Sequence, residues 1–246
     1  MFNILFARTF IIVGVMLVIS SVTAKINRAF ETASEMWITF ISSFALLFAV
    51  MIYADFYPLN LILVACFSAI IGWQIGPTIE HFGTKFKIRK YFKSKGIKLK
   101  KGQQITIEQR KEFQKSFNLN KYQSEWQNII FQAVFATALA VFCTAGMVFL
   151  TSIDFNFLGG FLFIALVMLV IMGLVNALFF KSKLVSLLRA YIGAIIFTLY
   201  LLYDFNRLEK MKGDSSWGTA IEISINLYLD IINLFLELLV ILTETD

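Results

Sequence analysis

The residues Ala220–Leu242, AIEISINLYLDIINLFLELLVIL, form an apolar stretch that carries two amides and three carboxylic acids within it. As an α-helix these residues would rise about 34 Å at 1.5 Å per residue. The hydrocarbon core of a bilayer is about 30 Å thick, so the stretch is long enough to cross it. A helix is favoured because it satisfies its own backbone polar groups within lipid.

Six further stretches have the same length and character, and the composition agrees with them. Hydrophobic residues make up 59% of the 246-residue chain and charged residues only 15%, whereas a soluble domain carries about 25% charged residues. The sequence therefore predicts an all-α membrane protein, a seven-transmembrane helix bundle that forms one domain over residues 1–246 and contacts the lipid bilayer. The six stretches are Phe2–Val22, Met36–Ala54, Leu59–Ile79, Ile129–Leu150, Phe157–Phe180 and Leu184–Tyr203.

The first stretch has two interpretations. Arg8 precedes an apolar run and Val22-Thr23-Ala24 would suit a signal peptidase. We favour a membrane span, because the apolar run reaches about 20 residues and Lys25 and Arg28 follow it as a stop signal would.

Positive charge is concentrated in the segment His81–Gln127. It holds 13 of the 22 Lys and Arg residues and three of the 16 acids, a local net charge of +10 in a chain of +6. The sequence predicts a basic loop insert here, and the remaining chain shows no general basicity that would indicate nucleic-acid binding. A solvated cytoplasmic loop is one interpretation; docking on anionic lipids or on a membrane protein is the other. The positive-inside rule then predicts a cytoplasmic C-terminus.

The polar side chains of Ala220–Leu242 share one face of the expected helix. At about 100° per residue they fall within an arc of about 80°, and the stripe should point into the bundle or into water rather than into lipid. Asp230 lies about ten residues from either end of its span, too deep for its short side chain to reach the interface. We expect an ion pathway along this stripe; its members are Glu222, Asn226, Asp230, Asn233 and Glu237.

A second acid can meet Asp230 at the same depth. The preceding span ends near Asp204, and the midpoint of 204 and 230 is Trp217, inside the Gly/Ser-rich break Gly213–Thr219. In an antiparallel helix pair, residues equidistant from the turn lie at one level. The register therefore permits contact between Asp204 and Asp230, with Arg207 one turn further along as a possible counter-charge.

Two carboxyl groups in contact in a poorly hydrated site cannot both ionise cheaply. The pair would act as a latch, with a shared proton joining the helices in acid and repulsion parting them after its loss. Both carboxylates, when ionised, would offer hard oxygen ligands to Ca²⁺. We expect no enzyme activity and no cofactor: an intramembrane aspartyl protease would need Gly-x-Gly-Asp where the chain has Tyr228-Leu229-Asp230, and other catalytic motifs are missing from the sequence.

These segments together resemble the Bax inhibitor-1 (transmembrane Bax-inhibitor-motif) family. The similarity is carried by four segments in the family's order. They are Pro58-Leu-Asn with Gly72 and Gly76-Pro77, Asp154-Phe-Asn-Phe-Leu-Gly-Gly continuing to Leu174-Val-Asn, Tyr203-Asp204, and Leu227-Tyr-Leu-Asp230-Ile-Ile-Asn233.

The resemblance implies a function and a location. It places the last helix at the centre of the bundle and makes Asp204 and Asp230 the pH-sensing di-aspartyl unit of a Ca²⁺ leak channel. Some members are cytoprotective regulators, and some bacterial ones bind a membrane-anchored protease, so a non-conducting regulator that acts through partner binding is the alternative. We expect a multi-pass protein of a bacterial plasma membrane.

Overall fold

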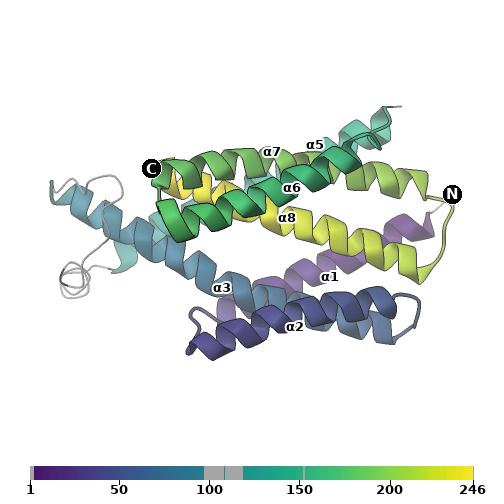
Figure 1. Cartoon of the computed structure of the whole chain (residues 1–246), viewed down its shortest axis with the longest axis horizontal. Helices are drawn as coiled ribbons and strands as arrows, with labels where there is room; N and C mark the ends of the chain where they lie inside the picture. Colours follow the sequence, from purple (N-terminus) through teal and green to yellow (C-terminus); the bar gives the residue numbers. More distant parts are fainter. Residues whose placement is uncertain (1–2, 97–107, 109–118, 152, 246) are drawn as a thin grey trace. The chain divides into compact units, whose positions relative to one another are not determined.

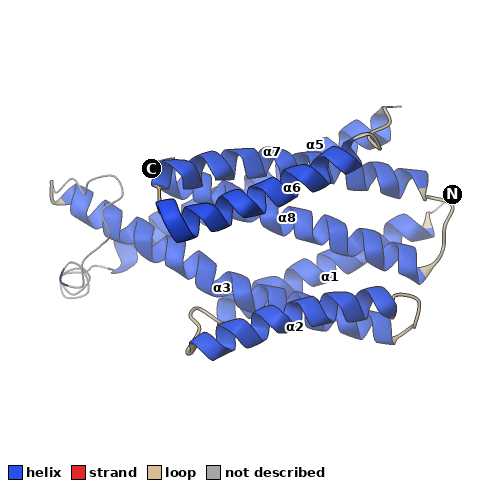
Figure 2. Ribbon diagram, in the orientation of Figure 1, coloured by secondary structure: helices blue, strands red, loops and turns tan. Residues whose placement is uncertain are grey.

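The computed structural model describes residues 3–96, 108, 119–151 and 153–245, with 119–121 described by backbone alone. Figures 1 and 2 show that its elements are helices, and no strand occurs among the described residues. The predicted all-α fold is confirmed. The elements are α1 (Ile4–Ile26), α2 (Ala33–Ile52), α3 (Leu59–Ser94), α5 (Leu119–Leu150), α6 (Leu158–Val175), the π-helical turn η1 (Asn176–Phe180), α7 (Lys183–Lys210) and α8 (Trp217–Thr245).

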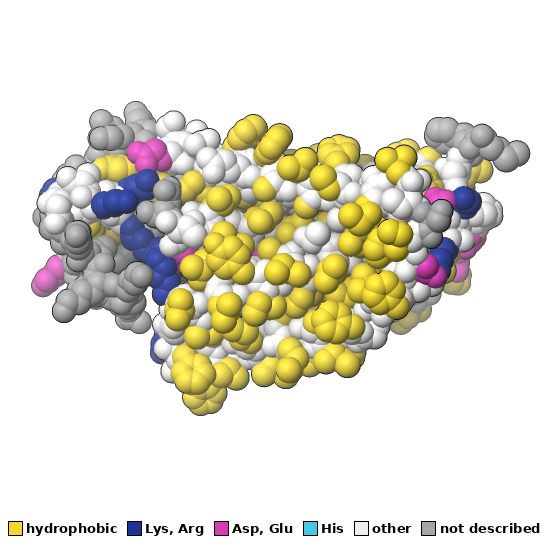
Figure 3. Space-filling view, turned by 90° about the horizontal axis from the view of Figure 1, so that it is seen from above, with side chains coloured by type: hydrophobic (Ala, Val, Ile, Leu, Met, Phe, Trp, Pro, Cys, Tyr) yellow, Lys and Arg dark blue, Asp and Glu magenta, His cyan; other side chains and the backbone are white. Residues whose placement is uncertain are grey.

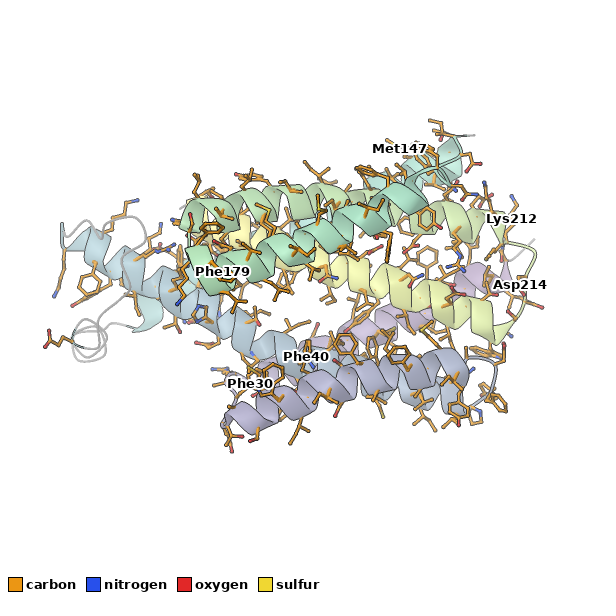
Figure 4. The ribbon with its side chains drawn as sticks, viewed as in Figure 1. Phe30, Phe40, Met147, Phe179, Lys212 and Asp214 are labelled. Atoms are coloured by element: carbon orange, nitrogen blue, oxygen red, sulfur yellow. The ribbon has the colours of Figure 1, made fainter. Side chains whose placement is uncertain are left out.

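In the described part of the chain, seven helical segments are long and apolar enough to cross a membrane. The most apolar window of α6 has a mean hydropathy of 2.8, yet only 17% of it is buried within the protein. Phe40, Met147 and Phe179, labelled in Figure 4, are among the exposed hydrophobic side chains, and the face drawn in Figure 3 is covered largely by such side chains. Water would penalise this exposure, so these surfaces face lipid in a multi-pass membrane protein.

The last helix is the most buried of the seven, with 44% of its window enclosed, as expected for the central helix. Its residues Tyr228 and Ile223 are fully buried. The stripe of acids and amides identified in the sequence therefore lies on the helix whose span has the largest buried share.

The chain divides into two compact units. The first comprises the described residues of Met1–Glu80, Thr144–Asn156 and Tyr200–Ile232; the second comprises those of His81–Cys143, Phe157–Leu199 and Asn233–Asp246. Four helices, α3, α5, α7 and α8, contribute residues to both units, and the expectation of a single domain stays a prediction.

The first unit includes a close contact between α1 and α3. A Cβ atom added to Gly76 would lie 1.9 Å from the carbonyl oxygen of Asn27, and one added to Gly72 would lie 2.1 Å from Thr23 Oγ1. Small residues permit this approach. The carbonyl of Trp73 also accepts a hydrogen bond from Asn27 Nδ2 at 2.8 Å, which fixes the two helices in register.

The second unit corrects the expected extent of the basic loop. Residues 81–94 continue α3 without a break, and α5 already begins at Leu119. Phe86, Ile88 and Phe92 are buried, because this continuation of α3 packs against Tyr122 and Trp126 of α5. The apolar side chains interleaved with cations in the sequence are thus a helix's packing face. The remainder of the predicted loop, apart from residues 95, 96 and 108, lies outside the described residues.

Candidate functional site: a buried pair of aspartates

The turn between α7 and α8 sets the register of the first unit's polar residues. Asp214, three residues before α8, accepts hydrogen bonds from the Ser216 backbone N–H at 2.8 Å and from the Thr219 hydroxyl at 2.5 Å. The Thr219 hydrogen bond is the main reason why the pKa of Asp214 lies below its usual value. Figure 4 labels Asp214 in this turn, together with Lys212.

Two other segments of the first unit hold the turn in place. Asp55 accepts a hydrogen bond from the Gly218 backbone N–H at 2.8 Å, which places a carboxylate at the positive end of the α8 dipole. The Arg8 guanidinium lies 4.1 Å from the centre of the Trp217 ring and donates to the carbonyl of Ser215. Tyr57 stacks on the same ring. The start of α8 is therefore fixed to α1 and to the α2–α3 connection.

This turn brings Asp204 and Asp230 together. Their carboxyl groups lie within hydrogen-bonding contact of each other, an arrangement that the register permits. Asp204 is 3% exposed and Asp230 is 7% exposed, so water reaches neither carboxyl group freely. The Asp230 Oδ2 atom is buried and lacks a hydrogen-bond partner among the described residues. An unpartnered buried oxygen beside a second carboxyl group is suited to receive a proton or a cation.

The charged neighbours of the pair in the first unit are Arg207 and Glu222. The charge of Arg207 acts on Asp204, while its Nη2 atom donates to Glu222 Oε1 at 2.8 Å. The Glu222 side chain is 51% exposed. Asn226 lies between Glu222 and Asp230 on α8 and is half-buried. The positive charge of Arg207 is thus shared between Asp204 and Glu222.

A cation held by this pair would need more ligands than the pair provides. Ca²⁺ takes six to eight oxygen ligands in proteins, and two carboxyl groups supply at most four. In the chain segments that are described, no group of three or more His, Cys, Asp or Glu side chains is placed to hold a metal ion. Water or backbone oxygens would have to complete the coordination at Asp204 and Asp230. The donor set thus fits a cation in transit or a shared proton better than a permanently bound Ca²⁺.

The remaining members of the stripe lie in the second unit. Asn233 is half-buried, and the buried Glu237 accepts hydrogen bonds from both terminal nitrogens of Arg189, at 2.8 and 3.0 Å. The five polar residues therefore share one helix face but not one environment. Glu237 is paired with the guanidinium of Arg189 on α7. Glu222 is solvent-exposed and paired with Arg207.

Sequence reasoning missed the partners of two acids in the second unit. Arg189 lies inside an apolar span, and an ionisable residue in such a position is itself a signal of a buried partner. Glu244, whose side chain is 3% exposed, forms ion pairs with Lys85, Arg89 and Lys183 at 2.6, 2.7 and 2.8 Å. Lys85 and Arg89 fall within the loop that the sequence predicts, so nothing in the sequence pattern indicates that they bind the end of α8.

Comparisons with known proteins identify the family of the chain. The family model described as "Inhibitor of apoptosis-promoting Bax1" matches residues 117–246, more than half of the chain, including both aspartates. Protein LIFEGUARD 2 of Arabidopsis thaliana is 36% identical over 121 residues, 48% of this chain and 49% of that protein. An uncharacterized protein of Campylobacter jejuni is 39% identical over 114 residues, 46% of this chain and 47% of that protein.

A viral protein matches to a similar extent. The Golgi anti-apoptotic protein of Vaccinia virus is 36% identical over 119 residues, 48% of each chain. The chain thus spans about half the length of the curated relatives it matches. The family model covers α5 to α8 and the pair that joins α7 to α8. On these grounds the chain belongs to the Bax inhibitor-1 family of membrane proteins.

Proposed function

We propose that this protein is a pH-sensitive cation leak channel, with Ca²⁺ as the favoured ion, in which Asp204 and Asp230 form the gate. The observation that carries the proposal is the contact between two buried carboxyl groups on successive helices, where one oxygen of Asp230 has no hydrogen-bond partner in the described part of the chain. Buried ionisable groups within membrane spans are costly and mark pathways for ions or protons.

The gate would work through a shared proton. When one proton is shared, the two carboxyl groups attract each other and hold α7 against α8. When the proton leaves, two negative charges face each other in a poorly hydrated site, and their repulsion favours separation of the helices. A separated and ionised pair then offers oxygen ligands to a passing cation. Leak should therefore rise as the pH rises through the range in which the pair loses its proton.

The experiment is cation flux into liposomes that contain the purified full chain. Replacing both acids, Asp204→Asn with Asp230→Asn, keeps the side-chain size and removes the titration. We expect the double variant to lose the pH dependence of Ca²⁺ flux. Unchanged flux with an unchanged pH profile would sink the proposal.

A matched control is available on the same helix. Glu222→Gln removes one carboxylate from the same polar face, but at an exposed position outside the pair. We expect this variant to keep the pH dependence, since the shared proton is untouched. If Glu222→Gln by itself abolished the pH dependence of Ca²⁺ flux, the titrating group of the gate would be Glu222 and not the aspartate pair.

The second candidate is a non-conducting regulator that acts by binding a partner. It is favoured by the anti-apoptotic names of the family model and of the viral relative. Shortening the segment between Gly96 and Leu119 separates the two functions, because a channel would keep its flux while a regulator would lose its partner. Residues 85 and 89 must be retained in this deletion, since both bind Glu244.

Neither function requires catalysis or a resident cofactor, and both are proposed for a bacterial plasma membrane, in keeping with the Campylobacter relative. Ca²⁺ enters the proposal as the transported ion. A hydrolysis assay with membrane-embedded peptide substrates checks the absence of protease activity, and cleavage abolished by Asp230→Asn would contradict it.

A further inference from the structure

A pocket of about 380 Å³ in the second unit has polar groups of both charges around it. Lys90 of α3 supplies an ammonium group and Glu125 of α5 supplies a carboxylate. Asn128 and Gln132 add amides, each of which can both donate and accept hydrogen bonds. Thr245 at the end of α8 adds a hydroxyl. A ligand that satisfies this lining must itself carry a positive and a negative group.

The pocket lies at the ends of two membrane spans. Thr245 is the last residue of α8, and the α5 residues that line the pocket come from the first turns of the span Tyr122–Leu150. Ile129 lies one turn deeper than Glu125, and Leu242 lies one turn deeper than Thr245. Glu125 and Thr245 therefore stand nearer the ends of their spans than Ile129 and Leu242, so that a headgroup at Glu125 would have apolar side chains on its inner side, together with the single amide of Gln132.

Lys90 and Glu125 are able to engage such a ligand. The distance from Lys90 Nζ to Glu125 Oε2 is 3.5 Å, longer than the 2.7–2.9 Å of a tight charge-assisted hydrogen bond. Their side chains are 24% and 41% exposed. Each charged group thus retains accessible surface from which a ligand can make a shorter contact.

The lining also discriminates among headgroups. Glu125 with the amide of Asn128, one turn away on α5, suits an ammonium that has N–H donors. A quaternary ammonium has none and is recognised mainly by aromatic faces, and the described residues that line the pocket include no aromatic side chain. An anionic headgroup without an amine would leave Glu125 facing a phosphate. We propose that this pocket binds the phosphoethanolamine headgroup of a membrane phospholipid, with its phosphate on Lys90 and its ammonium on Glu125.

The proposal stands apart from the leak function and has its own experiment. The delipidated full chain is mixed with phosphatidylethanolamine, phosphatidylcholine or phosphatidylglycerol of identical acyl chains, and bound lipid is counted by native mass spectrometry. We expect phosphatidylethanolamine to bind about tenfold more tightly than phosphatidylcholine, because one hydrogen bond to a charged group is lost with the methylated amine. Equal binding of these two lipids, or preference for phosphatidylglycerol, overturns the proposal.

Two variants give different patterns. Glu125→Gln should reduce phosphatidylethanolamine binding to the level of phosphatidylcholine, whereas Lys90→Gln should weaken both lipids alike because both contain the phosphate. Glu209→Gln, which breaks the exposed ion pair with Lys212, is the matched control and should leave the preference intact. A preference that survives Glu125→Gln would contradict the assignment of the ammonium.

Folding and ligand source are tested separately. The reversed pair, Lys90→Glu with Glu125→Lys, keeps both charges in the pocket, and its thermal unfolding midpoint should match the parent chain. It should retain the preference for phosphatidylethanolamine, and loss of preference in this folded variant overturns the proposal. Soluble glycerophosphoethanolamine should compete only weakly, since it lacks the acyl chains. If glycerophosphoethanolamine competed as strongly as phosphatidylethanolamine, the pocket would bind a soluble ligand rather than a membrane lipid.

Discussion

The guanidinium of Arg189 on α7 donates from Nη1 and Nη2 to the two carboxylate oxygens of Glu237 on α8, at 2.8 and 3.0 Å. The Glu237 side chain is 7% exposed and that of Arg189 is 26% exposed. Gly193 lies beside the pair, and a Cβ atom there would come within 2.9 Å of the Glu237 carboxyl carbon. The lack of a side chain at 193 therefore makes room for a buried carboxylate, and the pair fixes α7 against α8 within the second unit.

Removing one partner of this pair should destabilise the protein. Arg189→Met leaves Glu237 as an uncompensated buried charge, and we expect a loss of up to about 3 kcal/mol of unfolding free energy. The double replacement, Arg189→Met with Glu237→Met, should recover most of the loss because no charge remains buried. Unfolding in detergent mixtures measures both. A double variant as unstable as the single variant would show that the carboxylate is not the cause.

The close approach of α1 and α3 predicts different outcomes for two glycines. Gly76→Ala places a methyl group against the backbone of Asn27, and overpacking of this kind costs about 1–3 kcal/mol. Gly14→Ala in α1 meets no atom within 4 Å and should change stability by less than about 0.5 kcal/mol. The thermal unfolding midpoints of the two variants provide the comparison. Equal midpoints would refute the tight contact.

Asp154, outside the membrane spans, predicts a pH-dependent contribution to stability. Lys210 Nζ donates to its Oδ2 atom at 2.6 Å, and this hydrogen bond lowers the pKa of Asp154 below its ordinary 3.8. A lowered pKa in the folded state gives stabilisation that is present above the ordinary value and is lost as the pH falls through the folded value. The parent chain should therefore exceed Asp154→Asn in unfolding midpoint at neutral pH and converge with it in strong acid.

A control isolates this ion pair from other acids. In the Lys210→Gln background the effect of Asp154→Asn at neutral pH should shrink, because the main partner is already gone. The same difference with and without Lys210 would assign the stabilisation to Asn206, which also donates to Asp154 at 3.2 Å.

Loss of the buried hydroxyl of Tyr228 should lower the unfolding free energy by less than loss of Arg189. This hydroxyl lies 2.6 Å from Ser20 Oγ, and the Ser20 hydroxyl donates to the carbonyl of Ser68 at 2.8 Å. Tyr228→Phe removes one buried hydrogen bond between α8 and α1, and we expect a loss of about 1 kcal/mol. In the Tyr228→Phe background, Ser20→Ala should lower the unfolding free energy by less than it does in the parent chain, since the two hydroxyl groups are partners. Strict additivity of the two substitutions would argue against their contact.

The membrane spans and the common depth of the two aspartates could be predicted from the sequence. The spans depend on runs of apolar residues, and the depth depends on the number of residues between each aspartate and the turn. Seven apolar stretches predict seven helices, since backbone groups in lipid must be satisfied within the segment. The common depth of Asp204 and Asp230 follows from their equal distances to one short turn, whereas their contact also requires that both helices be rotated toward each other. The end of α3 was not accessible, because the cations interleaved with Phe86 and Phe92 have the composition of a loop. Only packing against α5 shows which side chains are buried.

The sequence by itself determined the class of the protein, the number of spans and the pair of acids that one turn brings to the same level. Tertiary structure alone decided the partners of the other charges: Arg189 for Glu237, Arg207 for Glu222, and three cations for Glu244. The reason is physical. Helical periodicity specifies which residues share a face of one helix, whereas the rotation of each helix about its axis, which selects the facing partner, is set by packing among distant segments.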